Sequence, residues 1–186
     1  ATMGETLKDF GADSVFINGA NAVDPEGNVG VFVANPAGGT IGWSYGILSA
    51  RGCHLIVPVG LEKLVPSVRA AARSCGQDTY YYCQGIRVGM IPIMNATVVT
   101  EIEAFRILFD LRAVHVGGGG IGDSQGSVVV VAEGEQGPLD RAIALIESIK
   151  GEPSLAPTKS ACSNCLPTIL VHTDEGVRRE VKHCMF

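Results

Sequence analysis

The run His54-Leu55-Ile56-Val57-Pro58-Val59-Gly60 is short and apolar, and it ends at a glycine. The same pattern occurs upstream at 14–19, which ends at Gly19, and downstream at 113–117, which ends at Gly117. Segments with helical patterns lie between these runs. Continuous apolar strands that alternate with helices are typical of a sheet covered by helices on both faces. The sequence therefore predicts an α/β fold with a mostly parallel sheet flanked by helices.

The glycines follow the same pattern. There are 24 in 186 residues, about twice the average share, and many of them lie where apolar runs end, at 19, 38–39, 60 and 117–122. Ligands bind open α/β sheets at the carboxyl ends of the strands, and glycine lets the backbone approach a ligand closely. We therefore expect these loops to form a binding rim along one edge of the sheet.

Apolar spacing and start signals predict where the helices lie. Thr40 is expected to cap one of them, and the Thr100/Glu103 pair resembles a capping box for another. Residues 24–28, with a proline and a glycine, predict a turn. The helices are expected at 3–10, 40–49, 66–75, 100–108 and 138–150, and a charged helical tail is expected after a last strand at 168–172.

Composition excludes several classes of protein. The chain is 46% hydrophobic and 18% charged, which argues against a disordered chain, a collagen and a coiled coil. The net charge is −5, and the only basic cluster is Arg178, Arg179 and Lys182, so we expect no nucleic acid partner. No apolar run is long enough to span a membrane. Residues 1–5 lack the features of a signal peptide, which favours a cytoplasmic protein.

The densest glycine loop, at 117–127, follows one strand and precedes another. A dinucleotide site needs a helix after such a loop, and an ATP-binding P-loop needs Gly-Lys-Ser/Thr, so the sequence supports neither. Its amides could still hold an anion, and the alternative is a tight connection between strands with no ligand. The candidate ligand-binding residues here are Gly118, Gly119, Gly120, Asp123 and Ser124.

A second candidate loop precedes the helix expected at 40–49. The backbone of Gly38 and Gly39 and the hydroxyl of Thr40 could meet an anionic group at the helix N-terminus. The alternative is that these residues only cap the helix and allow close packing.

Three segments resemble a known family. These are Asn18-Gly19-Ala20-Asn21-Ala22-Val23, the turn Glu26-Gly27-Asn28-Val29, and Val57-Pro58-Val59-Gly60-Leu61-Glu62-Lys63-Leu64-Val65. Together they resemble the LUD (lactate-utilisation) domain family. More broadly, they are similar to the NagB/RpiA/CoA-transferase-like superfamily. The resemblance spans 13–73, about a third of the chain, and implies a Rossmann-like core with ligands at strand ends.

The family resemblance and the strand ends together add ligand-binding candidates. These are Gly19, Asn21, Gly60 and Lys63, the last as a partner for an anionic substrate. Related isomerases often have an aspartate where this chain has Asn21, and a neutral amide cannot act as a general base. The alternative for Asn21 is a left-handed turn position, and for Lys63 a surface lysine. CoA transferases use a nucleophilic glutamate, for which Glu62 and Glu133 are candidates near strand ends.

The cysteines suggest a small module after the main domain. We expect an α/β domain at 1–150, followed by a linker and a short Cys/His appendage at 151–186. The C-x-x-C at 162–165 could form a zinc site with two later ligands. A redox pair and inert thiols are the alternatives. The candidate metal ligands are Cys162, Cys165, His183 and Cys184. His115, in the middle of a strand, is expected to be a core histidine.

Three functions remain open on the sequence. The first is binding of a small anionic metabolite (a carboxylate, sugar phosphate or CoA ester) at the glycine loops, with or without catalysis. The second is a metal-binding or redox-accessory subunit that uses the C-x-x-C. The third is a sugar-phosphate isomerase or CoA-transferase-like enzyme, with Asp123 and Glu62 as its candidate carboxylates. A homo-oligomer or a complex with a partner subunit is possible in each case.

Overall fold

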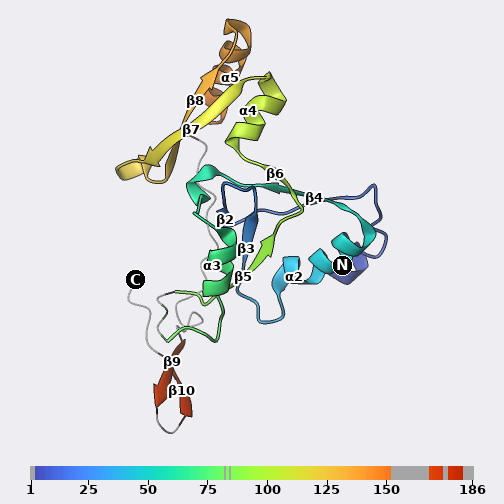
Figure 1. The fold of residues 1–186 in the computed structure, drawn as a ribbon, viewed down its shortest axis with the longest axis vertical. Helices are drawn as coiled ribbons and strands as arrows, with labels where there is room; N and C mark the ends of the chain where they lie inside the picture. Colours follow the sequence, from blue (N-terminus) through green and yellow to red (C-terminus); the bar gives the residue numbers. More distant parts are fainter. Residues whose placement is uncertain (1–2, 82, 84, 152–167, 174–175, 182–186) are drawn as a thin grey trace.

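The chain folds into several small sheets with helices beside them (Figure 1). The structure, a computed structural model, describes residues 3–81, 83, 85–151, 168–173 and 176–181. Helices occur at five of the six places where the sequence predicts them, and this confirms the mixed α/β class. They are α1 (Met3–Thr6), α2 (Gly39–Arg51), α3 (Val68–Ser74), α4 (Glu101–Phe109) and α5 (Gln136–Ile149).

A three-stranded parallel sheet is built from two of the quoted apolar runs and a third segment. Its order is β1-β4-β6, with β1 (Val15–Ile17), β4 (His54–Pro58) and β6 (Thr97–Val99). Side chains alternate between the two faces of a strand, so β4 turns Leu55 and Val57 into the core, where both are buried. The sheet places the ends of all three strands along one edge.

The core lies between this sheet, helix α2 and a second, antiparallel sheet. That second sheet has the order β2-β3-β5, with β2 (Ala22–Val23), β3 (Val29–Val33) and β5 (Gly89–Ile93). Apolar side chains from all of these elements form one buried cluster, which is the main source of stability by the hydrophobic effect. Its buried members are Leu7, Ala20, Val23, Val29, Val31, Ile41, Leu48, Leu55, Val57, Val59 and Ile93.

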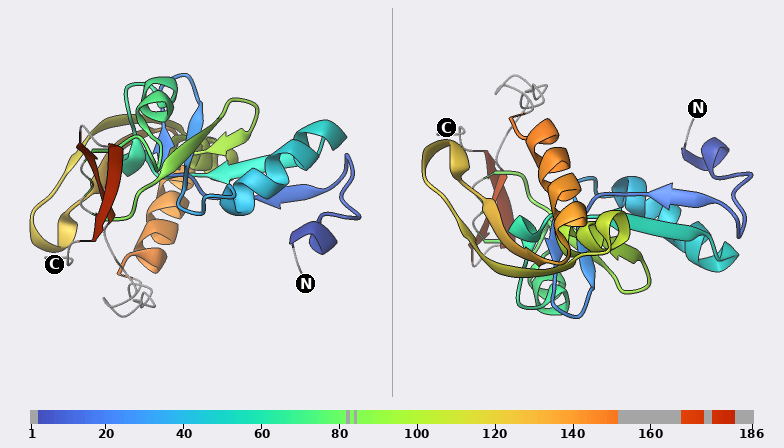
Figure 2. Two further views of the ribbon diagram at one scale, coloured as in Figure 1. Left: turned by 90° about the horizontal axis from the view of Figure 1, so that it is seen from below. Right: turned by 90° about the horizontal axis from the view of Figure 1, so that it is seen from above.

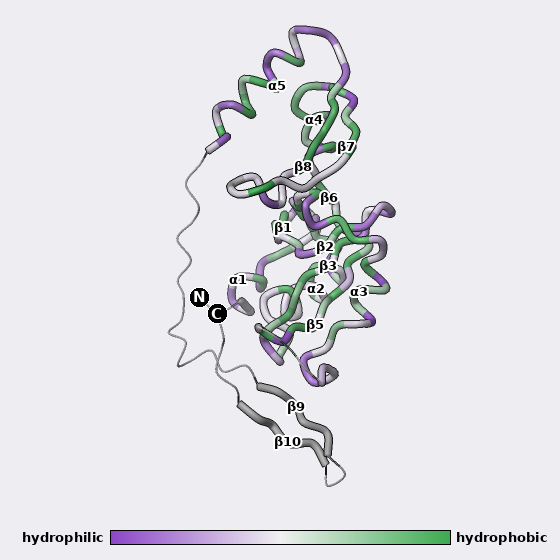
Figure 3. Tube along the Cα trace, turned by 90° about the vertical axis from the view of Figure 1, so that its left-hand side faces the viewer, coloured by the Kyte–Doolittle hydropathy of each residue, from purple (hydrophilic) through white to green (hydrophobic). Residues whose placement is uncertain are grey.

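A long antiparallel hairpin extends away from this core. It consists of β7 (Arg112–Gly119) and β8 (Ser127–Glu133), joined through the short 3₁₀ turn η2 (Gly122–Ser124). Helices α4 and α5 lie on the same side of the hairpin (Figure 2). Hydrophobic stretches run along α4, β7 and α5 in this part of the molecule (Figure 3).

The expectation of a mostly parallel sheet is confirmed for the sheet β1-β4-β6 and is wrong for the other described sheets. Among the described strands, β1-β4 and β4-β6 pair in parallel, and the other four pairs are antiparallel. The glycine run explains part of the error. Gly117 does not end a strand of the parallel sheet, because β7 continues through it to Gly119 with a shift in register between His115 and Gly117. An interruption of this kind is typical of a β-bulge.

The C-terminal segment also differs from the prediction. The strand expected at 168–172 is present as β9 (Thr168–Thr173). The chain expected to be a helical tail forms β10 (Gly176–Val181), which pairs with β9 in an antiparallel hairpin. The sequence Gly-Val-Arg-Arg-Glu-Val carries valines at both ends of a charged centre, and pairing with the apolar β9 decides its conformation over the local charge pattern.

Candidate functional site

Two of the predicted strand-end residues, Gly19 and Gly60, lie at the edge where the parallel strands end. Beyond β1, the Asn18 amide donates to the Ile56 carbonyl at 3.1 Å, and beyond β4 the Val59 amide donates to the Val99 carbonyl at 3.0 Å. Gly19 and Gly60 therefore follow neighbouring parallel strands, as the sequence predicts. Open α/β sheets bind their ligands at this kind of edge.

A pocket opens where the segment after β4 meets the β7-β8 hairpin. Its volume is about 320 Å³, which suits a small metabolite. The segment after β4 forms the 3₁₀ turn η1 (Leu61–Lys63). The lining residues are Leu61, Glu62, Leu64, His115, Gly118, Gly119, Gly126, Ser127 and Val128. Two segments more than 50 positions apart in the chain thus form one hollow, which we call the η1–hairpin pocket.

An ion pair lies at this pocket. Lys63 Nζ lies 2.5 Å from Glu62 Oε1, and both side chains are a little over one-third exposed. Burial alone would raise the pKa of Glu62, but the hydrogen bond from Lys63 and one from the backbone outweigh burial and lower it. Glu62 is therefore an ionised carboxylate at neutral pH. A Cβ on Gly60 would overlap the Glu62 carboxylate, so a larger residue there would make this flexible side chain move.

Glu101 fixes the position of η1. It is the first residue of α4, and both of its carboxylate oxygens accept from the Leu61 amide, at 2.9 and 3.2 Å. The sequence marked this region only as a helix start. A negative charge in the first turn of a helix is also favourable, so one side chain serves both α4 and the pocket wall.

We expect the substitution Glu101→Gln to lower the free energy of unfolding by about 1 kcal/mol, because a neutral amide oxygen is a weaker acceptor for the Leu61 amide. Glu103→Gln is the matched control, since Glu103 makes only an exposed pair with Arg106 and such pairs contribute little. Urea unfolding of both variants measures the difference. Equal losses of unfolding free energy in the two variants would show that the hydrogen bond from Leu61 to Glu101 adds no measurable stability.

The loop before α2 lies outside the η1–hairpin pocket. Gly38 is the N-cap and Gly39 the first helical residue, so the prediction that Thr40 caps the helix is wrong, and no described side chain caps it. The left-handed φ of Gly38, 96°, explains the glycine there, and a Cβ would also approach the Gly42 Cα to 3.1 Å. Capping and close packing thus account for Gly38, and the ligand role of Gly38, Gly39 and Thr40 remains a prediction.

Asn21 extends the pairing of β2 with β3. Its amide donates to the Gly30 carbonyl at 2.8 Å, and its side-chain Oδ1 accepts from the Phe32 amide at 2.9 Å. The left-handed turn considered for Asn21 is wrong, because Asp110 is the only described residue other than glycine with a positive φ. Neither Asn21 nor Gly19 lines the η1–hairpin pocket.

The other predicted residues are divided between the pocket and positions outside it. Gly118 and Gly119 line it, and Gly60 and Lys63 flank its Glu62 wall. Gly120 and Ser124 do not line it, and Asp123 lies in η2 at the hairpin tip. His115, expected to be a core histidine, lines the pocket from a half-buried position on β7.

The predicted metal site cannot be placed. Cys162, Cys165, His183 and Cys184 all lie outside the described residues. Within the described part of the chain, no group of three or more His, Cys, Asp or Glu side chains could hold a metal ion. Cys53, Cys75 and Cys83 carry free thiols there.

Comparisons with known proteins give no assignment: no family model matches the chain, and a search of curated proteins finds no match. Among the described helices, none is long and apolar enough to cross a membrane.

Proposed function

We propose that this protein binds a small anionic metabolite (a carboxylate, a sugar phosphate or a CoA ester) in the η1–hairpin pocket. One observation carries the proposal: two glycine-containing segments, each singled out by the sequence, meet around a hollow of about 320 Å³. Small-molecule sites are usually preformed pockets that contain a small number of polar groups.

The polar groups at the pocket suit an anion once Glu62 is accounted for. Lys63 neutralises the Glu62 carboxylate, so the pair brings no net charge to the pocket. His115 adds an imidazole that can donate a hydrogen bond from a ring N–H. An incoming carboxylate or phosphate would compete with Glu62 for the Lys63 ammonium and accept from His115. The glycines at 118 and 119 leave the wall without side chains, which allows close approach.

A catalytic role is a second candidate, because Glu62 and His115 line the same hollow. An ionised carboxylate can serve as general base or nucleophile, and an imidazole nitrogen can accept or donate a proton. This combination would suit an isomerase or a CoA-transferase-like enzyme. The resemblance to the LUD family, which implies a Rossmann-like core, is compatible with either role. The third function, a metal or redox accessory subunit, depends on the C-x-x-C and remains a prediction.

Titration calorimetry with a panel of carboxylates, sugar phosphates and CoA esters tests the proposal. We expect one member of the panel to bind at one site per chain and Lys63→Met to weaken that binding at least about tenfold, the effect of losing one charge-assisted contact of about 1.4 kcal/mol. Lys8→Met is the control, because Lys8 is an exposed lysine on the segment after α1.

The outcomes distinguish the two roles. If Glu62→Gln keeps the affinity and abolishes turnover of a bound ligand, the catalytic role is supported. Binding without turnover in the unmodified protein leaves binding alone as the function. The proposal would be contradicted if no member of the panel bound, or if Lys8→Met and Lys63→Met weakened binding equally.

A further inference from the structure

The charges at the η1–hairpin pocket restrict the kind of carboxylate that it can hold. Among its described lining residues, Glu62 alone has a carboxylate, ammonium or guanidinium group, and the Lys63 ammonium neutralises it from 2.5 Å. A ligand with only negative charge would gain this ammonium, but it would also lie close to the Glu62 carboxylate, and like charges in contact repel. A ligand that carries a charge of each sign avoids this repulsion.

Glu62 has acceptor positions for a second cation. Its side chain is a little over one-third exposed, so a ligand in the pocket can reach it. A carboxylate can accept about four hydrogen bonds, and Glu62 accepts one from Lys63 Nζ and one from the backbone. The remaining positions can accept from an ammonium group of the ligand, beside the Lys63 ammonium that would bind the ligand's carboxylate.

The spacing of the pair determines how far apart the two charges of the ligand can be. Lys63 Nζ and Glu62 Oε1 are 2.5 Å apart, so a ligand that binds both must hold its own ammonium and carboxylate similarly close together. An α-amino acid does so, because both groups are bonded to one carbon atom. The four charges would then alternate in sign, which makes every neighbouring pair attractive.

The rest of the pocket suits a small apolar side chain. Leu61, Leu64 and Val128 are among its lining residues. The hydroxyl of Ser127, which also lines it, already donates to the Gly119 carbonyl at 2.9 Å. The volume of about 320 Å³ is near the small end of the range for ligand pockets. A compact apolar group therefore fits this space better than a long polar one.

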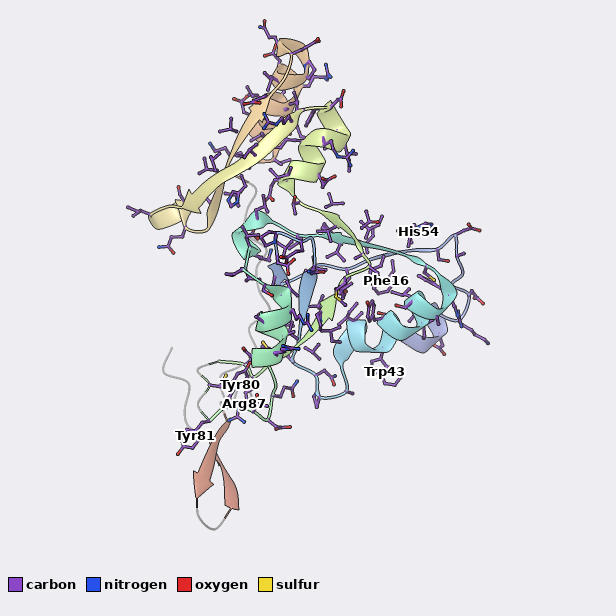
Figure 4. All side chains as sticks on the ribbon, in the orientation of Figure 1. Phe16, Trp43, His54, Tyr80, Tyr81 and Arg87 are labelled. Atoms are coloured by element: carbon purple, nitrogen blue, oxygen red, sulfur yellow. The ribbon has the colours of Figure 1, made fainter. Side chains whose placement is uncertain are left out.

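The described part of the pocket has no aromatic ring on which a nucleotide base could stack. Phe16, Trp43 and Tyr80 lie elsewhere in the molecule, away from the β7-β8 hairpin (Figure 4), and the described lining residues include no Phe, Tyr or Trp. Proteins commonly hold bases by stacking them on such rings. The pocket therefore favours a small amino acid over a CoA ester, which carries an adenine.

We propose that the ligand of the η1–hairpin pocket is an α-amino acid with a small apolar side chain, whose ammonium binds Glu62 and whose carboxylate binds Lys63. This assignment rests on the function proposed above, and it narrows the ligand from carboxylates in general to those that carry an α-ammonium group. Leu61, Leu64 and Val128 would contact the side chain of the amino acid.

Titration calorimetry of the full chain with L-alanine, L-valine and L-leucine tests the assignment. Each amino acid has two matched probes: the carboxylate that lacks the amino group, and the amine that lacks the carboxyl group. We expect at least one amino acid to bind at one site per chain, at least about ten times more tightly than either matched probe, because each probe loses one charge-assisted contact.

Glu62→Gln should remove this preference. It should weaken binding of the amino acid at least about tenfold, and it should leave the matched carboxylate bound as tightly as before or more tightly, because the repulsion from Glu62 is gone. Glu103→Gln is the control, since Glu103 pairs with Arg106 and does not line the pocket. It should leave every affinity unchanged.

The outcomes separate this assignment from the proposed function. Two results would overturn the assignment and leave the proposed function standing: a matched carboxylate that binds as tightly as its amino acid, or binding of another anion from the metabolite panel when none of the three amino acids binds. Equal weakening of the amino acid and its matched carboxylate by Glu62→Gln would also overturn the assignment, because general damage to the pocket affects both. If neither the amino acids nor any member of the panel binds, both proposals fail.

Discussion

Replacing Asp24 with asparagine should lower the free energy of unfolding at neutral pH by about 2–4 kcal/mol, because it removes a buried carboxylate whose two oxygens both accept hydrogen bonds. Asp24 is 3% exposed. Its Oδ1 accepts from the Asn28 amide at 2.9 Å, and its Oδ2 accepts from the Val68 amide at 2.9 Å and from Asn28 Nδ2 at 3.1 Å. The carboxylate thus ties the turn after β2 to the start of α3, 44 residues later.

Asparagine fits the space but not the hydrogen bonds. Its amide group would direct two N–H donors at one of the two oxygen positions, where donors already point from the chain. At least one buried N–H would then lose its acceptor. Urea unfolding measures the loss, and Asp140→Asn, an exposed position on α5, is the control. A loss below about 0.5 kcal/mol, typical of a surface substitution, would contradict the role of Asp24.

The same carboxylate makes stability depend on pH. Burial would raise the pKa of Asp24, but the hydrogen bonds from Val68 and Asn28 outweigh burial and lower it below 3.8. A group whose folded pKa is lowered stabilises the fold above its unfolded pKa, and the contribution is lost as the pH falls through the folded pKa. The difference in stability between the unmodified protein and Asp24→Asn should therefore be constant from pH 7 to about 5 and shrink below about 4.

Asp24 also marks what sequence reasoning can and cannot predict. The turn at 24–28 was predictable, because proline, glycine and asparagine favour turns for local reasons. The bond from Val68 was not, because it joins residues far apart in the chain. The five helices were predictable from periodicity for the same local reason. The direction of strand pairing was not, since an apolar run of this length fits a parallel or an antiparallel neighbour equally well.

The pocket shows the same division. Glycines at strand ends pointed to Gly60, Gly118 and Gly119, and all three lie in or beside the η1–hairpin pocket. The role of His115 was missed, because which face of β7 meets η1 depends on the docking of two distant segments. Glu101 carried a signal, an acidic residue at a helix start just after a strand, but its partner Leu61 is 40 residues away.

Replacing Gly120 with alanine should unfold the tip of the β7-β8 hairpin, with a local cost of at least about 3 kcal/mol. Gly120 has a φ of 110°, which L residues rarely adopt. In addition, a Cβ there would overlap the backbone carbonyl of Ser124. Backbone cannot rotate away as a side chain can, so η2 would have to move. Hydrogen exchange of the β7 and β8 amides measures this opening directly.

Gly122→Ala separates the two contributions. Gly122 also has a positive φ, 62°, but a Cβ there would meet no described atom within 4 Å, so its alanine should cost only about 1–2 kcal/mol. If the Gly120 variant exchanges no faster than the Gly122 variant, the steric argument fails. The pair also addresses why the loop is rich in glycine. Faster exchange in the Gly120 variant would mean that this glycine is required to close the hairpin. Because Gly120 does not line the pocket, any loss of ligand binding in that variant would follow from the opening of the pocket wall. It would not follow from the loss of a contact between Gly120 and the ligand.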